Sequence, residues 1–196
     1  MLWSEARERE MDRSSPKPAP GPLALVQDFI NTRNYLRGGD MLEDAEAATT
    51  WLAGRGLLGE GERIEEAERR LLITLREGLR SLLLARNGGP PPDLQLLDNL
   101  AASAALRVRF GPDGRPAIEP GGEGGPAERA VARLLAAVMQ AEEQGTFERL
   151  KACRNEDCKW AFYDASKNRS GSWCNMSICR ARHKMRAYRK RKSGTR

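Results

Sequence analysis

The sequence predicts a mainly α-helical fold with one β-hairpin, followed by a small cysteine-rich module at the C-terminal end. Three observations lead to this prediction. The chain has 196 residues, which is enough for one ordinary domain and a small appendage. Aromatic residues make up only 6% of it, and Leu and Ala dominate, so we expect an aliphatic, helical core. All four cysteines lie between Cys153 and Cys179, in a segment with little apolar surface of its own.

Helical periodicity predicts five helices before the cysteines. Apolar side chains recur three and four positions apart in each of them, as on the buried face of an amphipathic helix. Asp40 is expected to cap the second helix, and glycine follows the predicted ends of several. The five segments are residues 23–36, 40–54, 62–86, 93–101 and 126–143.

A β-hairpin is predicted where the period of the sequence changes from helical to alternating. In the segment LRVRF, Leu106, Val108 and Phe110 alternate with two arginines. The following GPDG is a turn sequence. Residues 116–120 begin and end with proline, so we expect them to return as an edge strand.

Three regions are predicted along the chain. Residues 1–22 are expected to be a disordered leader, because SSPKPAPGP has no apolar periodicity to offset the entropy of ordering. Residues 23–150 are expected to form a helical domain, and residues 151–196 the small module. Residues 1–150 hold 19 Lys+Arg against 24 Asp+Glu, whereas residues 151–196 hold 14 against 3. The basic end indicates a polyanionic partner, although a solubilising tail would have the same composition.

The spacing of the cysteines predicts a structural metal site. Cys153 and Cys158 form one close pair, and Cys174 and Cys179 form a second pair after a 15-residue gap. Two such pairs suit the tetrahedral coordination of zinc, and four soft thiolates suit zinc or an iron–sulfur centre rather than calcium or magnesium. Zinc is preferred because the spacing does not resemble the closely spaced cysteine runs of ferredoxins. We therefore expect one structural zinc ion per chain. Two alternatives stay open: a pair of disulfides, which a reducing compartment disfavours, and a redox site, which the lack of C-x-x-C disfavours.

A strongly basic helix is predicted to follow the second cysteine pair. Asn175 or Ser177 is expected to cap it, and it runs to about Lys192 with Cys179 in its first turn. The resulting order of knuckle, hairpin and helix resembles a treble clef. His183 could substitute for a cysteine as a ligand, but we expect it to face the surface or a phosphate. The bases predicted to contact nucleic acid are Arg180, Arg182, Lys184, Arg186, Arg189, Lys190, Arg191 and Lys192 on the helix, with Lys167 and Arg169 in the preceding loop.

These motifs resemble the CGNR zinc finger of bacterial proteins. The resemblance rests on the cysteine pairs and on residues 160–164 (WAFYD), 166–170 (SKNRS) and 173–176 (WCNM). The Cys-Gly-Asn-Arg signature of that family reads Cys-Arg-Ala-Arg at residues 179–182. The departure leaves the metal site intact, but no contact of the missing asparagine is carried over.

The preceding part of the chain is similar to the ABATE domain that comes before this finger in the family. The similarity rests on Leu25 and on residues 28–32 (DFINT). It implies a transcription regulator with a C-terminal DNA-binding finger and an N-terminal domain that senses an effector or a partner. A homodimer is compatible with such a regulator, but no dimer face is identifiable. Asn31, a polar residue among apolar neighbours, is expected to cap or tie a loop, and a ligand-sensing role is the open alternative.

The sequence argues against an enzyme and against a membrane protein. The chain has a single histidine, and four metal-bound thiolates would leave no open position for water. No stretch reaches the roughly 18 apolar residues of a membrane helix, and the N-terminus does not read as a signal peptide. We therefore expect a cytoplasmic protein.

Two functional hypotheses follow. In the first, the finger binds duplex DNA, with its helix facing a groove and its lysines and arginines holding phosphates. In the second, zinc stabilises a basic module that binds RNA or a protein of the transcription machinery. Charge serves both hypotheses equally. Arg180 and Arg182, early in the helix, could reach guanine edges, and this favours DNA.

Overall fold

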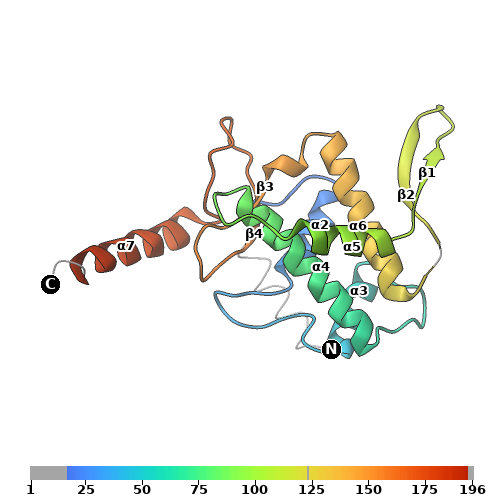
Figure 1. Cartoon of the computed structure of the whole chain (residues 1–196), viewed down its shortest axis with the longest axis horizontal. Coiled ribbons are helices and arrows are strands. Elements are labelled where there is room, and N and C mark those ends of the chain that lie inside the picture. Colours follow the sequence, from blue (N-terminus) through green and yellow to red (C-terminus); the bar gives the residue numbers. More distant parts are fainter. Residues whose placement is uncertain (1–16, 123, 194–196) are drawn as a thin grey trace.

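Helices form most of the regular structure in the computed structural model, which describes residues 17–122 and 124–193 (Figure 1). The elements are α2 (Leu23–Asn31), α3 (Ala45–Gly54), α4 (Glu66–Ala85), α5 (Leu94–Ser103), β1 (Leu106–Phe110), β2 (Pro116–Pro120), α6 (Pro126–Glu143), the 3-10 turn η1 (Phe147–Arg149), β3 (Leu150–Ala152), β4 (Ala161–Tyr163), the π-helical turn η2 (Met176–Arg180) and α7 (Ala181–Ser193). The predicted class, mainly α with a β-hairpin, is confirmed. A second small hairpin, β3–β4, is added to it.

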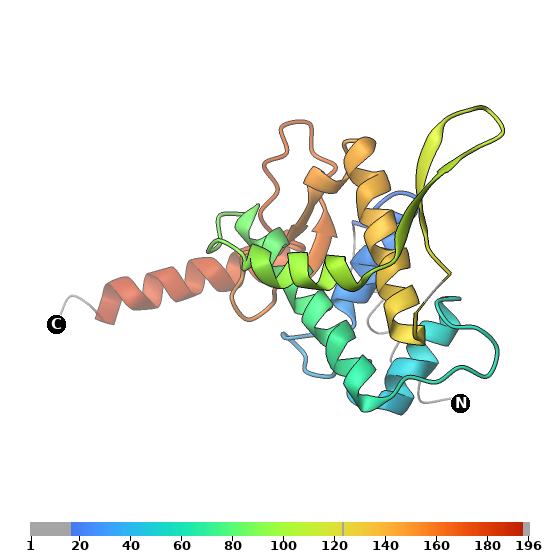
Figure 2. The same cartoon turned by 45° about the vertical axis from the view of Figure 1, so that its right-hand side comes forward.

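Helices α2, α4 and α6 pack together at the centre of the molecule. The buried face of α4 carries leucines three and four residues apart, including Leu72, Leu75 and Leu79, as the periodicity predicted. Helix α2 contributes Phe29 and helix α6 contributes Leu134, and both side chains are fully buried. Figure 2 shows α5 and α6 lying against α4. None of the helices in the described part of the chain has the length and apolar character of a membrane span.

Two helices begin later than the sequence predicted. Asp44, not Asp40, caps α3, and its carboxylate accepts a hydrogen bond of 2.8 Å from the backbone N–H of Ala47. Asp40 instead pairs with Arg76 on α4 at 2.6 Å. Its carboxylate therefore joins two segments that are distant in the sequence, and no local sequence pattern predicts such a contact. Helix α4 begins at Glu66, four residues after its predicted start.

The predicted β1–β2 hairpin forms with the predicted strands. β1 runs antiparallel to β2, and Val108 lies opposite Ile118. Both figures show the hairpin projecting from the helices at the end of the molecule away from α7. Its apolar side chains stay largely in solvent, with Phe110 69% exposed.

The β3–β4 hairpin shares its core with the helices. The predicted domain boundary, residue 150, falls at the first residue of β3. Leu150, Ala152 and Ala161 are fully buried in the same hydrophobic cluster as the side chains of α2, α4 and α6. The division into two separately folding parts stays a prediction. Side chains from both predicted parts contribute to one hydrophobic core.

The structure gives residues 17–22 a defined place, although the sequence assigned them to a disordered leader. The carbonyl oxygen of Lys17 accepts a hydrogen bond of 3.0 Å from the N–H of Tyr163, so this segment lies beside β4. Ala19 is buried, and its N–H donates to the side chain of Gln27. The first of these contacts joins segments more than 140 positions apart, and composition alone does not reveal it. Residues 1–16, the rest of the predicted leader, lie outside the described residues.

Candidate metal centre and basic helix

The four cysteines converge on one buried point. Cys153 follows β3, Cys158 lies in the turn before β4, Cys174 precedes η2, and Cys179 lies within η2. All four are free thiols, and their Sγ atoms lie within 4.8 Å of one another. The Sγ atom of Cys174 is 3.6 Å from that of Cys158 and 3.6 Å from that of Cys179. These separations are well beyond the roughly 2.05 Å of a disulfide bond.

The separations between sulfurs fit a four-thiolate metal site. With metal–sulfur bonds of about 2.3 Å, the corners of a tetrahedral zinc site lie about 3.8 Å apart. The two separations of 3.6 Å around Cys174 are close to that edge length. The cysteines could thus supply four ligands to one soft divalent cation without rearrangement of the chain.

Two tight turns place the sulfurs. In the first, the carbonyl oxygen of Asn155 accepts hydrogen bonds from the N–H groups of Cys158 and Lys159, at 2.8 and 3.2 Å. Lys159 has φ 52°, a left-handed conformation that closes the turn. In the second, the Asn175 side chain accepts from the backbone at the start of η2, and its carbonyl accepts from the N–H of Cys179 at 2.9 Å. Of the two predicted caps, Asn175 is the one that forms.

Crowding of the thiols shifts their pKa values in opposite directions. Hydrogen bonding to Cys153 and to the other thiols raises the pKa of Cys174 and lowers that of Cys179. The four groups therefore do not ionise together on their own, because each thiolate disfavours the next. A divalent cation removes that repulsion, and its binding is coupled to loss of the thiol protons.

Asn31 ties helix α2 to the cysteine module. Its Nδ2 donates to the carbonyl oxygen of Ala161 at 2.9 Å, and its Oδ1 accepts from the N–H of the same residue at 2.8 Å. Gln27, one turn earlier, donates to that carbonyl at 3.1 Å. Asn31 is buried, and its amide oxygen and nitrogen both bond to the backbone of β4. The arrangement agrees with the tying role considered from the sequence and offers no support for a ligand-sensing role.

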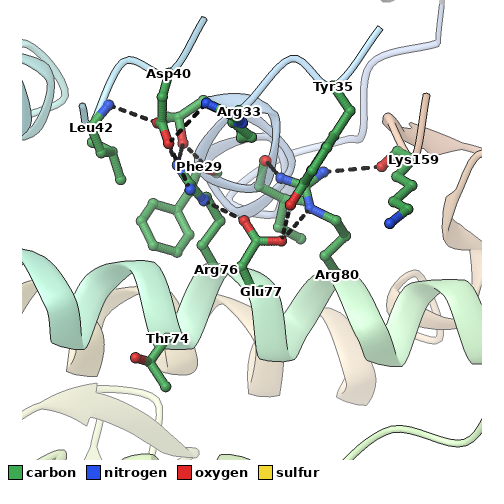
Figure 3. A network of polar contacts seen from close by, with 12 residues as sticks. Phe29, Arg33, Tyr35, Asp40, Leu42, Thr74, Arg76, Glu77, Arg80 and Lys159 are labelled. Atoms are coloured by element: carbon green, nitrogen blue, oxygen red, sulfur yellow. Dashed lines mark hydrogen bonds and ion pairs between the residues drawn. The ribbon is translucent and has the colours of Figure 1, made fainter. Parts of the chain in front are cut away.

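Two arginines of α4 extend this connection (Figure 3). Arg80 donates through Nη1 to the carbonyl oxygen of Lys159 at 3.0 Å, and through Nη2 to a carbonyl of α2. Its Nε pairs with Glu77 at 2.9 Å. Arg76 pairs with Asp40 at 2.6 Å and with Glu77 at 2.8 Å. The backbone next to the first cysteine pair is thus held directly by the helical core.

The network is buried and charged. The side chains of Arg76 and Arg80 are 3% and 2% exposed. Burial alone would raise the pKa of Asp40 and of Glu77, but the guanidinium groups hold both below their usual values. Tyr35 donates its hydroxyl to Glu77 at 2.9 Å. The sequence prediction missed this network. The sequence feature that could have revealed the network is a pair of arginines four positions apart, within the stripe of buried leucines.

The predicted basic helix forms and projects from the body of the molecule (Figure 1). His183 packs its ring against Trp173, with 4.8 Å between ring centroids, and so lies outside the cysteine cluster. Five of the eight bases predicted on the helix have exposed side chains and form no ion pair with the described residues; these are Arg180, Arg182, Lys184, Arg189 and Lys192. Lys190 and Arg191 lie on the helix, but their side chains are outside the described part.

Two of the predicted bases form ion pairs with acidic side chains. Arg186 forms ion pairs with Glu156, at 3.1 Å, and with Asp157, both in the first cysteine turn. It therefore braces α7 against the module, a role that the sequence prediction did not foresee. In the preceding loop, Lys167 is exposed, whereas Arg169 pairs with an acidic residue of η1.

The fold and the site define a helical protein that ends in a four-cysteine finger. Comparison with family models agrees with both parts. Residues 23–142 match ABATE, described as "Putative stress-induced transcription regulator", and residues 149–192 match the CGNR zinc finger. The first match covers more than half of the chain, and the chain therefore belongs to the ABATE family. Both resemblances inferred from the sequence are confirmed, in the same order along the chain. A search of curated proteins finds no match.

Proposed function

We propose that this protein is a DNA-binding transcription regulator in which one structural zinc ion holds the finger and α7 contacts the DNA. The observation that carries the proposal is the placement of α7. The helix projects from the body, bears no acidic residue, and leaves most of its described bases in solvent. Like charges so close together repel one another, and phosphate oxygens would relieve that repulsion. The family description, a transcription regulator, supports this assignment.

The zinc ion would be held by Cys153, Cys158, Cys174 and Cys179. Four thiolates complete a tetrahedron, and such closed sites are structural because no position remains for a reacting water. The ion would link the turn before β4 to η2 and so fix the start of α7 relative to the helical core. In this proposal the protein is not an enzyme.

The bases of the finger would act in two ways. Arg182 lies close to the cysteine cluster, three residues after Cys179, and we assign it to the edge of a base in the groove. Lys190, Arg191 and Lys192 lie at the free end of the helix and would contribute attraction to phosphates without regard to sequence. Helices α2–α6 would form the regulatory part, acting in the cytoplasm.

The experiment is selection of bound fragments from a random duplex library, followed by affinity measurements on the selected and a scrambled duplex at several salt concentrations. Arg182→Ala is expected to weaken the selected duplex by about 1–3 kcal/mol and to leave the scrambled one nearly unchanged. Replacement of Lys190, Arg191 and Lys192 by neutral residues should weaken binding to both duplexes alike. It should also reduce the slope of log affinity against log salt by about 0.9 for each lost phosphate contact.

Two outcomes would overturn the proposal. Equal losses on the two duplexes for Arg182→Ala would make the finger a phosphate clamp without base recognition. A protein that enriches no duplex but retains RNA or a protein of the transcription machinery would establish the second hypothesis considered from the sequence.

A further inference from the structure

A cleft of about 470 Å³ lies between the N-terminal segment, the loop after β4 and the start of η2. We infer that this cleft binds one phosphate group of the nucleic-acid backbone, held between Lys17 and Arg180. The inference rests on the proposed function and adds to it a contact from outside the finger. Lys17 was assigned by the sequence to a disordered leader, and no family motif includes it.

The cleft is lined by groups that bind phosphate. Lys17 and Arg180 line it from two sides, and Ser166, Ser170 and Ser172 line it from the loop. Ammonium and guanidinium groups form charge-assisted hydrogen bonds with phosphate oxygens, and serine hydroxyls are common donors to the same oxygens. Its volume lies within the range of about 300–1,000 Å³ that is usual for small-ligand pockets.

Among the described residues, Asp164 is the one acidic group that lines the cleft, and its charge is already neutralised. The carboxylate of Asp164 is buried and pairs with the Nζ of Lys151 at 2.8 Å. It also accepts hydrogen bonds from the N–H groups of Ser166 and Gly171, at 3.1 and 2.7 Å. A Cβ atom at Gly171 would lie 2.7 Å from this carboxylate, so the loop is closely wrapped around it. The net charge that faces a ligand in the cleft therefore comes from Lys17 and Arg180.

Lys17 is held in position before any ligand arrives. Its backbone carbonyl oxygen accepts a hydrogen bond from the N–H of Tyr163. Its Nζ donates to the carbonyl oxygen of Trp173 at 3.3 Å and lies over the ring of Phe162, 5.0 Å from the ring centroid. An ammonium group has three donors, and the described contacts use one of them. Arg180, across the cleft, is exposed and forms no ion pair with the described residues. A positioned lysine and a free arginine facing the same space would share one anion.

The position of the cleft identifies its ligand as part of a nucleic acid. Arg180 is the last residue of η2, and α7 begins at the next residue. A duplex lying along α7 would bring its backbone past this point, because the other bases proposed to hold phosphates follow along the same helix. The N-terminal segment would then contribute to binding through Lys17, and the contact surface would extend beyond the zinc finger.

The test compares Lys17→Met, Lys17→Arg and Arg180→Met with the full-length protein on its selected duplex, at salt concentrations from 50 to 200 mM. Methionine retains most of the apolar length of the lysine side chain but lacks the charge that lies over the Phe162 ring. Lys17→Met is expected to lower the salt slope by about 0.9, and Lys17→Arg to restore it. Arg63→Met, at an exposed base before α4, is the matched control and should leave the slope unchanged. Zinc content and melting temperature check that each variant is folded.

A double variant tests whether the two cations share one phosphate. If they do, Lys17→Met combined with Arg180→Met should lose less affinity than the sum of the two single changes. Additive losses would assign the cations to separate phosphates and overturn the shared cleft. An unchanged slope for Lys17→Met, with the wild-type protein still binding the duplex, would overturn the cleft alone. Absence of any duplex binding by the wild-type protein would overturn both the cleft and the proposed function.

Discussion

The arginines of α4 and those of α7 are the same residue type in opposite surroundings. Arg76 and Arg80 are almost completely buried, and each pairs with Glu77 within the helical core. Among the described side chains of α7, Arg186 is the one that forms an ion pair. A buried cation must recover the free energy of desolvation through its partners, whereas an exposed one retains its water. The first group is therefore committed to structure, and the second is available to bind.

The comparison shows that net charge does not distinguish buried bases from exposed ones. Charge counted along the chain describes α7 correctly, because its bases lie together and without acids. It describes α4 poorly, since acids and bases nearly balance there while two of the bases lie inside the core. Position relative to the leucine stripe separates the two cases, because Arg76 and Arg80 lie on the same helix face as Leu72, Leu79 and Leu83.

The largest effect is expected when the metal centre is removed, because the cysteine module lies between the buried arginines of α4 and the exposed arginines of α7. Cys174→Ser should abolish zinc binding and unfold the finger, because the segment has little other core. Most of the helical signal should remain. The melting temperature should fall, since Arg80 and Asn31 lose the ordered backbone that they contact. Metal analysis and circular dichroism measure these changes. Full zinc retention would disprove this ligand set, and loss of all helicity would exclude a separately folding helical domain.

The next largest effect is expected at the buried arginine nearest to the finger. Arg80→Met removes one of the two arginine partners of Glu77 and takes the donor from a buried carbonyl oxygen of α2 and from the partly buried carbonyl oxygen of Lys159. Breaking such a buried pair typically costs about 3–5 kcal/mol. Arg182→Met, on the exposed helix, should change the free energy of unfolding by no more than about 0.5 kcal/mol. Urea unfolding of both variants gives the comparison. Similar values for the two would show that burial does not separate these arginines.

A smaller effect is expected from acid, which removes charge from the same network without removing a side chain. Burial disfavours the ionised carboxylates, but Arg76 holds the pKa of Asp40 below its usual 3.8, and Arg80 together with Arg76 holds the pKa of Glu77 below its usual 4.5. A lowered pKa contributes stability that is complete above the unfolded value and is lost as the pH falls through the folded value. Unfolding by urea between pH 5 and pH 3 should therefore show declining stability. Asp40→Asn should have the shallower decline, and equal slopes would remove Asp40 from the cause.

The sequence predicts the parts of this molecule whose signals are local. Cysteine spacing predicted the cluster, and apolar periodicity predicted the helices and the β1–β2 hairpin. The contacts between distant segments left no such signal. Arg80 reaches Lys159 across 79 positions, and Lys17 lies beside Tyr163 across a still longer interval. Each of these partners is a backbone group, which every residue carries, so residue type does not mark it. The same reasoning explains Asp40, which reads locally as a cap but pairs with Arg76 instead.

The smallest effect on stability is expected at Arg186, which belongs to α7 but is tied to the body. Its two acidic partners, Glu156 and Asp157, are largely in solvent, and exposed ion pairs contribute about 0.2–1 kcal/mol. Arg186→Met should therefore lower the free energy of unfolding by less than about 1 kcal/mol and leave the zinc content unchanged. The orientation of α7 should loosen, because these pairs are its described side-chain contacts with the first cysteine turn. Hydrogen exchange of α7 amides would then become faster, while that of α4 would not. A loss of stability as large as that of Arg80→Met would place Arg186 with the buried arginines and erase the contrast between the two helices.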